Sequence, residues 1–381
     1  MERGGKFSEQ DFGQSGPAIA PWTLTQTLAV FERWLLLPNP TPIFAVLGAV
    51  AANYLPGDPV WLGLIGPPSS AKTEILNSTA LLPRVVQAGT LTSAALLSGT
   101  PRKQRDKGAK GGLLQQIGDF GIIALKDFGS VLGMRPDTKS ETLAALREVF
   151  DGRWTRLLGT DGGKQLHWEG KVGLIFGATG VIDAHYAVIG AMGDRFVLSR
   201  LTPQEGQFER ALQHAGEAGK RMRRELAEAV VHLFAGRRTE PRHINDAEIA
   251  RLAKTVSLIV RLRAPVERDR YSREVEAAYG AEGTGRVGMM LERLLAGLDV
   301  LGVEREQALM VVEAVAMDSV PPIRRSAYEI VCRYHNVETA DVALGLGLPT
   351  VTVRRALEDL AVYRLVERHS QGQGKADRWT A

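Results

Sequence analysis

Cysteine is nearly absent from this chain of 381 residues. Cys332 is the single cysteine, so no internal disulfide can form. The seven histidines are scattered, and no cluster of Cys and His has the spacing of zinc ligands. We therefore expect the protein to work in a reducing compartment without a structural metal.

Long apolar runs are missing as well. The longest, Ile43 to Leu55, lies between Pro42 and Pro56 and falls short of the roughly 20 residues that span a bilayer. The stretch Met1 to Gly16 is polar and lacks the apolar core of a signal peptide, so residues 1–20 are expected to form a flexible tail. These features predict a cytoplasmic protein with no membrane partner, in which the apolar run is a buried helix.

A large excess of one charge is also lacking. The formal net charge of +4 permits binding to a polyanion but does not require it. Hydrophobic residues make up 44% of the chain, which is enough for a buried core, and the length fits two or three domains. The local placement of charge must therefore decide whether nucleic acid is a partner.

The first half of the chain alternates between strand-like and helix-like segments. Residues 23–54 have the pattern of two helices, and Arg153 to Trp168 has the pattern of a hairpin with an Asp-Gly-Gly turn. Short apolar runs that fit buried strands occur at Val60–Ile65, Val85–Val86, Gly121–Asp127 and Lys171–Phe176. This alternation predicts an α/β domain with a parallel sheet over residues 21–202.

Beyond Thr202 the strand signals fade and charged amphipathic helices follow. They are expected at about 205–236, 246–263, 284–302 and 305–317, and they predict a helical domain over residues 203–319. After Val320-Pro-Pro322, helices are expected at Ile323–Tyr334 and Ala340–Gly345, and a third follows the turn at Gly347-Leu-Pro349 and runs to about Tyr363. Two extended runs then surround a Gly-Gln-Gly tip. Residues 320–381 are therefore expected to form a winged helix-turn-helix domain.

One segment carries a phosphate-binding pattern. Gly66-Pro-Pro-Ser-Ser-Ala-Lys-Thr73 fits G-x-x-x-x-G-K-[ST], except that Ala71 stands in place of the second glycine. In such a P-loop the backbone N–H groups cradle phosphates, Lys72 reaches the β and γ oxygens, and the Thr73 hydroxyl ligates Mg²⁺. The methyl group of Ala71 is tolerable if the backbone there is right-handed. The alternative is a chance turn before a helix.

The P-loop predicts ATP and Mg²⁺ as ligands. The expected nucleotide-binding residues are Gly66, Pro67, Pro68, Ser69, Ser70, Ala71, Lys72, Thr73 and Glu74. A P-loop ATPase also needs a carboxylate at the end of a neighbouring strand to hold the metal, and Asp127 closes the apolar run Ile122 to Lys126 as such a residue should. Thr73 and Asp127 are thus the predicted metal ligands.

The fourth predicted strand ends in Phe176-Gly-Ala-Thr-Gly180, and Gly193-Asp-Arg-Phe-Val-Leu-Ser-Arg200 follows. With the P-loop and Asp127, these segments make the chain resemble AAA+ ATPases of the pre-sensor-1-hairpin clade. It looks like the minichromosome maintenance helicases and the helicase-like ATPases of phages and mobile elements. The resemblance covers roughly residues 23–302 and implies an AAA+ nucleotide domain with an α-helical lid.

The resemblance also implies roles for single residues. Thr179 would sense the γ-phosphate, Arg195 would be the arginine finger offered to a neighbouring subunit, and Arg286 would be the second sensor on the lid. The hairpin 153–168 would point into a central channel, with Lys164 at its tip touching DNA. Ion pairing within the chain is the alternative for Arg195 and Arg200.

The water-activating residue is less well defined by the resemblance. Most AAA+ proteins place Glu after the metal-binding Asp, whereas this chain has Phe128. Glu148 is the first choice, ahead of Asp119 and Asp151, and each could equally be a surface or capping carboxylate.

The family arrangement also implies a homo-oligomeric ring, usually a hexamer, because a neighbour's arginine completes each ATP site. On this basis Arg195→Ala is expected to abolish hydrolysis while sparing ATP binding.

Besides the hairpin tip at Lys164, two regions carry residues that fit contacts with DNA, either single-stranded or forked. The second helix of a helix-turn-helix usually enters the major groove, and a wing can grip phosphate. The glycine-bearing loop 101–110 concentrates positive charge that could track a phosphate backbone. The predicted DNA-binding residues are Lys103, Arg105, Lys107, Lys110, Lys164, Arg354, Arg355 and Lys375. A protein-docking domain and a solvated loop are the respective alternatives.

Together these patterns predict an ATP-hydrolysing, ring-forming DNA motor. A replicative-type DNA helicase or helicase loader of a phage or mobile element is the leading hypothesis. One alternative is an ATP-dependent remodeller of a protein complex in defence or regulation. Another is a switch that binds ATP and DNA without hydrolysis.

Overall fold

The computed structural model describes most of the chain. The described residues are 19–98, 112–157, 165–184, 195–206, 209–210, 212, 216–269, 271–278, 280–372 and 376–381. They fall into two compact units: the first holds residues up to 184, then 195–243 and 289–312, and the second holds 244–288 and 313–381. This division does not test the domain boundaries predicted at residues 20, 202 and 319, which stay a prediction.

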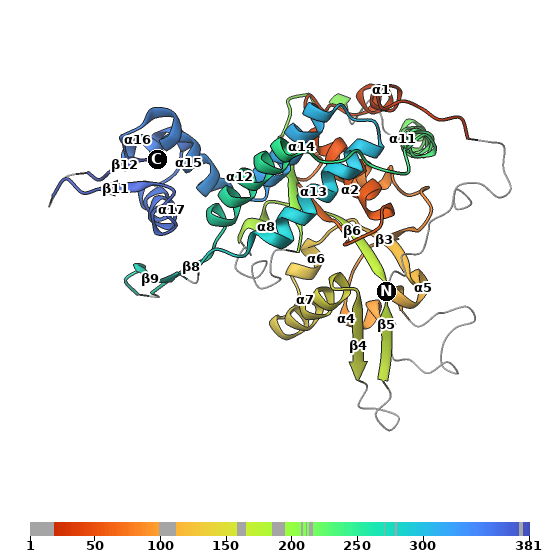
Figure 1. The fold of residues 1–381 in the computed structure, drawn as a ribbon, viewed down its shortest axis with the longest axis horizontal. Coiled ribbons are helices and arrows are strands. Elements are labelled where there is room, and N and C mark those ends of the chain that lie inside the picture. Colours follow the sequence, from red (N-terminus) through yellow and green to blue (C-terminus); the bar gives the residue numbers. More distant parts are fainter. Residues whose placement is uncertain are drawn as a thin grey trace. The chain divides into compact units, whose positions relative to one another are not determined.

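A parallel sheet of five strands forms the centre of the first unit (Figure 1). The strands are β1 (Trp61–Ile65), β2 (Val85–Ala88), β3 (Phe120–Leu125), β6 (Lys171–Ala178) and β7 (Val197–Arg200), in the order β2-β3-β6-β1-β7. Every residue of β1 and β3 is buried, as expected for parallel strands that are covered on both faces. The four predicted strands are confirmed, and β7 is a fifth that the sequence pattern did not predict.

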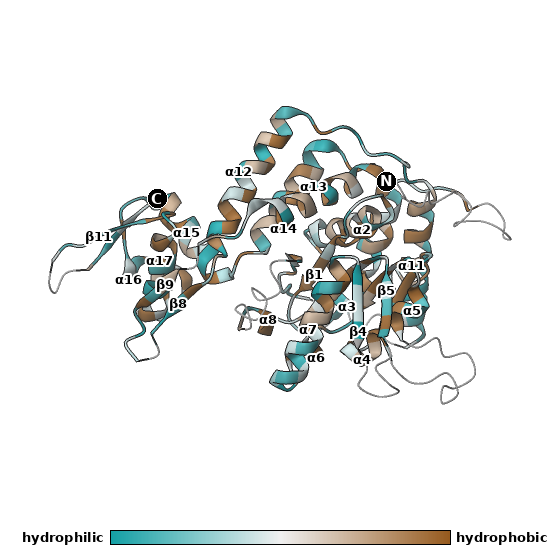
Figure 2. Ribbon diagram, turned by 60° about the horizontal axis from the view of Figure 1, so that its bottom comes forward, coloured by the Kyte–Doolittle hydropathy of each residue, from teal (hydrophilic) through white to brown (hydrophobic). Residues whose placement is uncertain are grey.

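The helices of this unit bury their apolar residues against the sheet and against one another. Those that precede or connect the strands are α1 (Leu24–Trp34), α2 (Thr41–Tyr54), α3 (Lys72–Asn77), α4 (Ser93–Leu96), α5 (Leu113–Ile117), α6 (Gly129–Leu132), α7 (Pro136–Phe150) and α8 (Val181–Ala184). Of the predicted helices of the second half, α11 (Glu217–Ala235) belongs to this unit and α12 (Asp246–Leu262) to the second, while the residues of α13 (Thr284–Val300) and α14 (Arg305–Asp318) are divided between the two. The longer helices carry both hydrophobic and hydrophilic residues (Figure 2).

The apolar run that is too short for a membrane span forms α2, which is buried almost throughout and packs against β1, β6 and β7. Asn53 in its last turn holds the start of β1, because its Nδ2 donates to the Val60 carbonyl at 2.8 Å and the Val60 N–H donates to its Oδ1 at 2.9 Å. Among the described residues, no helix is both long and apolar enough to cross a membrane.

The predicted hairpin is confirmed as β4 (Arg153–Leu157) paired with β5 (Gln165–Glu169). Trp154 lies opposite Trp168, whose indole N–H donates to the Gly118 carbonyl at 2.8 Å and so fixes the hairpin to the segment before β3. Lys164 lies outside the described residues.

The second unit contains α12 and the three predicted C-terminal helices. These are α15 (Pro322–Tyr334), α16 (Thr339–Leu346) and α17 (Thr350–Val362), beside a small antiparallel sheet of β10 (Val337–Glu338), β12 (Arg378–Thr380) and β11 (Glu367–His369). Trp379 of β12 is fully buried, and its indole N–H donates to the Thr339 hydroxyl at 2.8 Å.

A second hairpin departs from the expectation that residues 203–319 are wholly helical. It pairs β8 (Val266–Arg268) with β9 (Val275–Ala278). The strands are short, half-buried or exposed, and rich in charge, so they lack the apolar alternation from which strands are predicted.

Candidate nucleotide site

The P-loop joins the end of β1 to the start of α3. Gly66 is buried, and its N–H donates to the Ala178 carbonyl at 3.1 Å. The Lys72 Nζ folds back into the loop, donating to the carbonyls of Gly66 at 2.7 Å and Pro67 at 2.5 Å and to the Ser70 hydroxyl at 3.2 Å. Lys72 is thus held beside the loop by oxygen acceptors that phosphate oxygens can replace.

The backbone at Ala71 does not meet the condition under which its methyl group is tolerable. Its φ of 64° is left-handed, as is that of Ser69, also 64°. Left-handed residues that alternate with right-handed ones turn successive N–H groups toward one concave side, which is the anion-binding arrangement called a nest. The methyl group therefore sits where a side chain costs roughly 1–2 kcal/mol, and the glycine of the usual pattern would avoid this cost.

The carboxyl ends of three strands meet beside the P-loop. Ile65 at the end of β1 pairs with Ala178 at the end of β6, so Gly66 and Thr179 leave the sheet together. On the other side of β6, the Phe128 N–H donates to the Gly177 carbonyl at 2.7 Å, which places Asp127 at the same edge. The structure thus brings together Lys72, Thr179 and Asp127 from three separate segments.

Asp127 is exposed, and its carboxylate orientation is set locally. Its Oδ1 accepts a hydrogen bond from the Gly129 N–H at 2.8 Å. Burial lowers the pKa of Lys72 from its ordinary value, and the Asp127 carboxylate acts in the opposite direction. The two charges are therefore close enough to interact.

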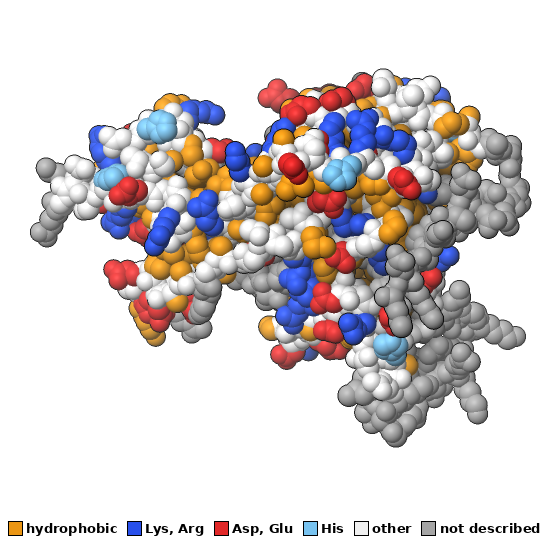
Figure 3. Space-filling model, in the orientation of Figure 1, with side chains coloured by type: hydrophobic (Ala, Val, Ile, Leu, Met, Phe, Trp, Pro, Cys, Tyr) orange, Lys and Arg blue, Asp and Glu red, His pale blue; other side chains and the backbone are white. Residues whose placement is uncertain are grey.

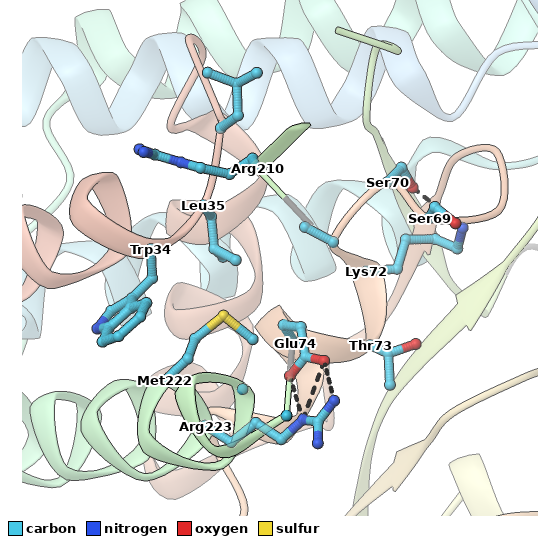
Figure 4. Close-up of a pocket in the computed structure, with 14 residues that line it drawn as sticks. Trp34, Leu35, Ser69, Ser70, Lys72, Thr73, Glu74, Arg210, Met222 and Arg223 are labelled. Atoms are coloured by element: carbon cyan, nitrogen blue, oxygen red, sulfur yellow. Dashed lines mark hydrogen bonds and ion pairs between the residues drawn. The ribbon is translucent and has the colours of Figure 1, made fainter. Parts of the chain in front are cut away.

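A cavity of about 480 Å³ opens next to the P-loop, within the usual range for small-molecule sites. Trp34, Leu35 and Leu36, which end α1 and follow it, line one side, and Gly219 and Met222 of α11 line another. Figure 4 shows Trp34 and Met222 on the side away from Lys72. The cavity therefore places an apolar compartment beside the P-loop.

Glu74 forms a bidentate pair with Arg223 of α11 at the rim of this cavity (Figure 4). The guanidinium Nε lies 3.0 Å from Oε2, and Nη2 lies 3.0 Å from Oε1. The hydrogen bonds and charge of Glu74 raise the pKa of Arg223. Glu74, which the sequence places just after the loop, thus ties α3 to α11, and Arg210 adds a second cation to the lining.

Sequence reasoning missed Trp34, Arg210, Met222 and Arg223. They lie far from the P-loop in the sequence, and none belongs to a motif. The sequence gives one signal, a tryptophan at the end of an amphipathic helix just before the first strand, but it does not distinguish a ligand contact from ordinary core packing.

The carboxylates predicted to activate water are not brought to this edge. Asp119 precedes β3, and its carbonyl accepts from the Lys171 N–H at the start of β6, so Asp119 marks the opposite edge of the sheet. The end of α7 reaches the same edge, because the Gly170 N–H donates to the Gly152 carbonyl at 2.9 Å. Glu148, in the last turn of α7, is exposed and lines a different recess.

Arg195 precedes β7 and also lies away from the P-loop of its own chain, as an arginine offered to a neighbour should. Its side chain is only 10% exposed, however, and its Nη2 donates to Asp151 Oδ2 at 2.6 Å. Arg200 forms a bidentate pair with Asp183. The alternative of ion pairing within the chain therefore describes both arginines in this structure, and a role for Arg195 in a neighbouring site requires the Asp151 pair to open.

Arg286 belongs to the second unit, in the exposed first turn of α13. Arg354 and Arg355 are exposed on α17. The other predicted DNA contacts, which are Lys103, Arg105, Lys107, Lys110, Lys164 and Lys375, lie outside the described residues.

The described residues contain no cluster of three or more His, Cys, Asp or Glu that could hold a metal ion. Mg²⁺ bound with a nucleotide needs few protein ligands, because substrate phosphates and water complete its octahedral shell. Thr73 and Asp127 at the P-loop edge fit that smaller requirement, and the nest fits the phosphates.

No protein-family model matches the sequence, and no curated protein matches it either. Among solved structures, the chain is similar to the A form apo structure of the NrS-1 C-terminal region, with 12% identity over 97% of this chain and 79% of that chain and a TM-score of 0.27. A second structure of that region, spanning residues 305–718, gives 11% identity over 95% and 77% of the two chains and a TM-score of 0.31. At these scores the likeness carries no weight, and the functional assignment rests on the geometry of the site.

Proposed function

We propose that the protein is an ATPase of the AAA+ type that acts on DNA as a ring-forming motor. The observation that carries the proposal is the convergence of Lys72, Thr179 and Asp127 at one edge of a parallel sheet, beside a cavity with an apolar compartment. In a P-loop ATPase these positions hold the phosphates, sense the γ-phosphate and hold the metal.

The order of the strands supports this assignment. β6 lies between the strand that leads into the P-loop and the strand that ends at Asp127, so the polar Thr179 projects from between the lysine and the carboxylate. Transfer of a phosphoryl group to water asks little covalent chemistry of the protein and depends mainly on positioning and on charge stabilisation. Mg²⁺, when bound by Thr73 and Asp127, would neutralise charge on the phosphates.

The same geometry predicts slow turnover by the isolated chain. Phe128 follows Asp127 and is buried, and it packs against Phe176 with ring centroids 4.5 Å apart. The other described carboxylates that follow these strands are already paired, Glu74 with Arg223 and Asp183 with Arg200. We therefore propose that efficient hydrolysis depends on a neighbouring subunit of a ring, which supplies its Arg195 once the pair with Asp151 opens on assembly.

The α15–α17 helices with the β10-β12-β11 sheet support the proposal of a winged helix-turn-helix, and this domain is the proposed link to DNA. Buried Phe128 also favours a second candidate function, a switch that binds ATP and DNA without turnover. The two candidates share the nucleotide site and differ in hydrolysis.

Nucleotide binding tests the assignment of the site. A fluorescent ATP analogue with Mg²⁺ should bind the wild-type protein, and Lys72→Ala should weaken binding at least tenfold because it removes a charge that contacts phosphate. Lys254→Ala, which removes an exposed lysine of α12, is the matched control and should bind like the wild type. Equal binding by the Lys72 and Lys254 variants would show that the nucleotide does not use the P-loop.

A further inference from the structure

The β8–β9 hairpin and α17 enclose a recess of about 650 Å³ within the second unit. One wall is a stripe along α17, and the opposite wall is the hairpin turn. The stripe consists of Val351, Arg354, Arg355, Glu358, Ala361 and Val362, whose spacing places them on one face of the helix. Arg354 and Arg355, which are predicted to contact DNA, therefore face the hairpin.

The hairpin is fixed to α17 by Arg268. Its Nη1 donates to Glu358 Oε2 at 2.9 Å, and its Nη2 donates to Asp359 Oδ1 at 2.6 Å and to the Arg355 carbonyl at 2.8 Å. Arg324 donates to the other oxygen of Asp359 at 2.8 Å. The two acidic residues of α17 are therefore already paired with arginines, and they do not cancel the positive charge of the recess.

The positive charge that remains comes from Arg273 on the hairpin and from Arg354 and Arg355. All three are exposed, and their side chains form no ion pair with a described residue. Arg368 also lines the recess but pairs with Asp377 at 2.6 Å, and Glu274 is the acidic residue on the hairpin wall. The recess therefore attracts an anion that can reach two walls at once.

The hairpin turn that leads to Arg273 carries an exposed aromatic side chain. Tyr271 is 95% exposed, an unusual position for a large ring, because apolar ring surface is normally buried. Asp269 shapes the turn, since its Oδ1 accepts from the N–H groups of Tyr271 at 2.8 Å and Ser272 at 2.6 Å. The exposed ring therefore lies on the hairpin turn two residues before Arg273, outside the lining of the recess itself.

The hairpin also limits how α17 can meet DNA. An α-helix with its side chains is about 10–12 Å wide, and the major groove of B-DNA is about 12 Å wide. A helix with a hairpin packed along its flank is too wide to enter the groove with that flank foremost. Arg354 and Arg355 are therefore poorly placed to read base pairs of a duplex.

We propose that this recess binds a single nucleic-acid strand, with the phosphodiester backbone between Arg273, Arg354 and Arg355 and a base stacked on Tyr271. Exposed aromatic rings beside a basic groove are the elements that bind single strands without sequence preference. The inference shares with the proposed function only the class of partner, since it needs neither ATP nor a ring. Figure 3 shows charged and hydrophobic side chains interspersed on the visible face of this unit, so that face is not uniformly basic.

The test measures binding of a labelled 20-nucleotide single strand to the full chain without nucleotide. Tyr271→Ala should weaken binding about tenfold, the range expected for one stacked base, and Tyr271→Phe should restore it. Tyr334→Ala, which removes a tyrosine that is 64% exposed elsewhere in the same unit, is the control and should have no effect. Equal binding by the Tyr271 and Tyr334 alanine variants would overturn the proposal, as would failure of the wild type to bind.

The arginines are tested by salt dependence. The combined variant Arg273→Gln, Arg354→Gln, Arg355→Gln should lower the slope of log K against log salt concentration by about 2, because each phosphate contact on a single strand contributes about 0.7. An unchanged slope would contradict the proposal that these three arginines contact phosphates. Tighter binding of duplex than of single strand, or equal competition by polyglutamate, would also contradict it. Binding of the ATP analogue to every variant separates these outcomes from failure of the nucleotide site.

Discussion

Ala71 offers a sensitive test of the P-loop conformation, because glycine at this position removes a strain that the structure displays. The φ of 64° costs an L-residue with a Cβ roughly 1–2 kcal/mol, whereas glycine adopts it freely. Glycine also gives the unfolded chain more freedom, which offsets roughly 0.4–1 kcal/mol of this gain. Ala71→Gly should therefore increase the free energy of unfolding by about 1 kcal/mol.

Thermal unfolding measures the effect. The transition that belongs to the first unit should move up by about 2–4 °C, since this unit is of the size for which 1 kcal/mol has that effect. Ala144→Gly is the matched control, because Ala144 lies inside the right-handed helix α7 and its replacement should destabilise by about 1 kcal/mol. If Ala71→Gly destabilised the unit like the control, the backbone at Ala71 would be right-handed and the nest would be wrong.

Two further changes test the packing and charge of the first unit. Burial, and then the charge of Arg293, lower the pKa of Lys171 to about 7, so the unfolded chain, with a pKa near 10.5, binds more protons between these values. The free energy of unfolding should therefore rise from pH 7 to pH 9 by up to about 1.4 kcal/mol per pH unit. Denaturant titrations should show that Lys171→Met removes this slope. An equal slope in both proteins would refute the lowered pKa of Lys171. Gly297→Ala should lower the free energy of unfolding by about 1–3 kcal/mol, because its Cβ would lie 2.0 Å from the Gly48 carbonyl oxygen. Gly288→Ala in the same helix is the control. It meets only ordinary contacts and should raise the free energy of unfolding by up to about 1 kcal/mol. Chemical denaturation that gave the two alanine variants the same sign would contradict the close approach of α13 to α2.

Much of the fold follows from short-range signals that the sequence contains in full. The runs that form β1, β3 and β6 are apolar throughout because both faces of these strands are covered, and such runs stand out in any sequence. By contrast, β7 is four residues long, and the β8–β9 hairpin exposes most of its side chains. Their strand conformation depends on pairing with segments elsewhere in the chain, and the residue pattern within each segment does not predict that pairing.

The site divides in the same way. Lys72, Thr73 and Asp127 follow from motif and strand position, because the chemistry of phosphate and metal restricts which residue types can serve there. The left-handed backbone of Ala71 could not be predicted, since residue type alone favours a right-handed backbone and the loop conformation overrides that preference. Trp34 and Arg223 reach the cavity only through the packing of α1 and α11, which no spacing in the sequence predicts.

ATP hydrolysis with and without single-stranded DNA tests the central claim most directly. Phosphate release by the wild-type protein at saturating Mg²⁺ and ATP should be slow alone and should rise when a single strand is added. Lys72→Ala should abolish release under both conditions, whereas Lys254→Ala should behave like the wild type. Release that persisted in the Lys72 variant, or that was absent from the wild type with and without DNA, would contradict the account of this protein as a P-loop DNA motor.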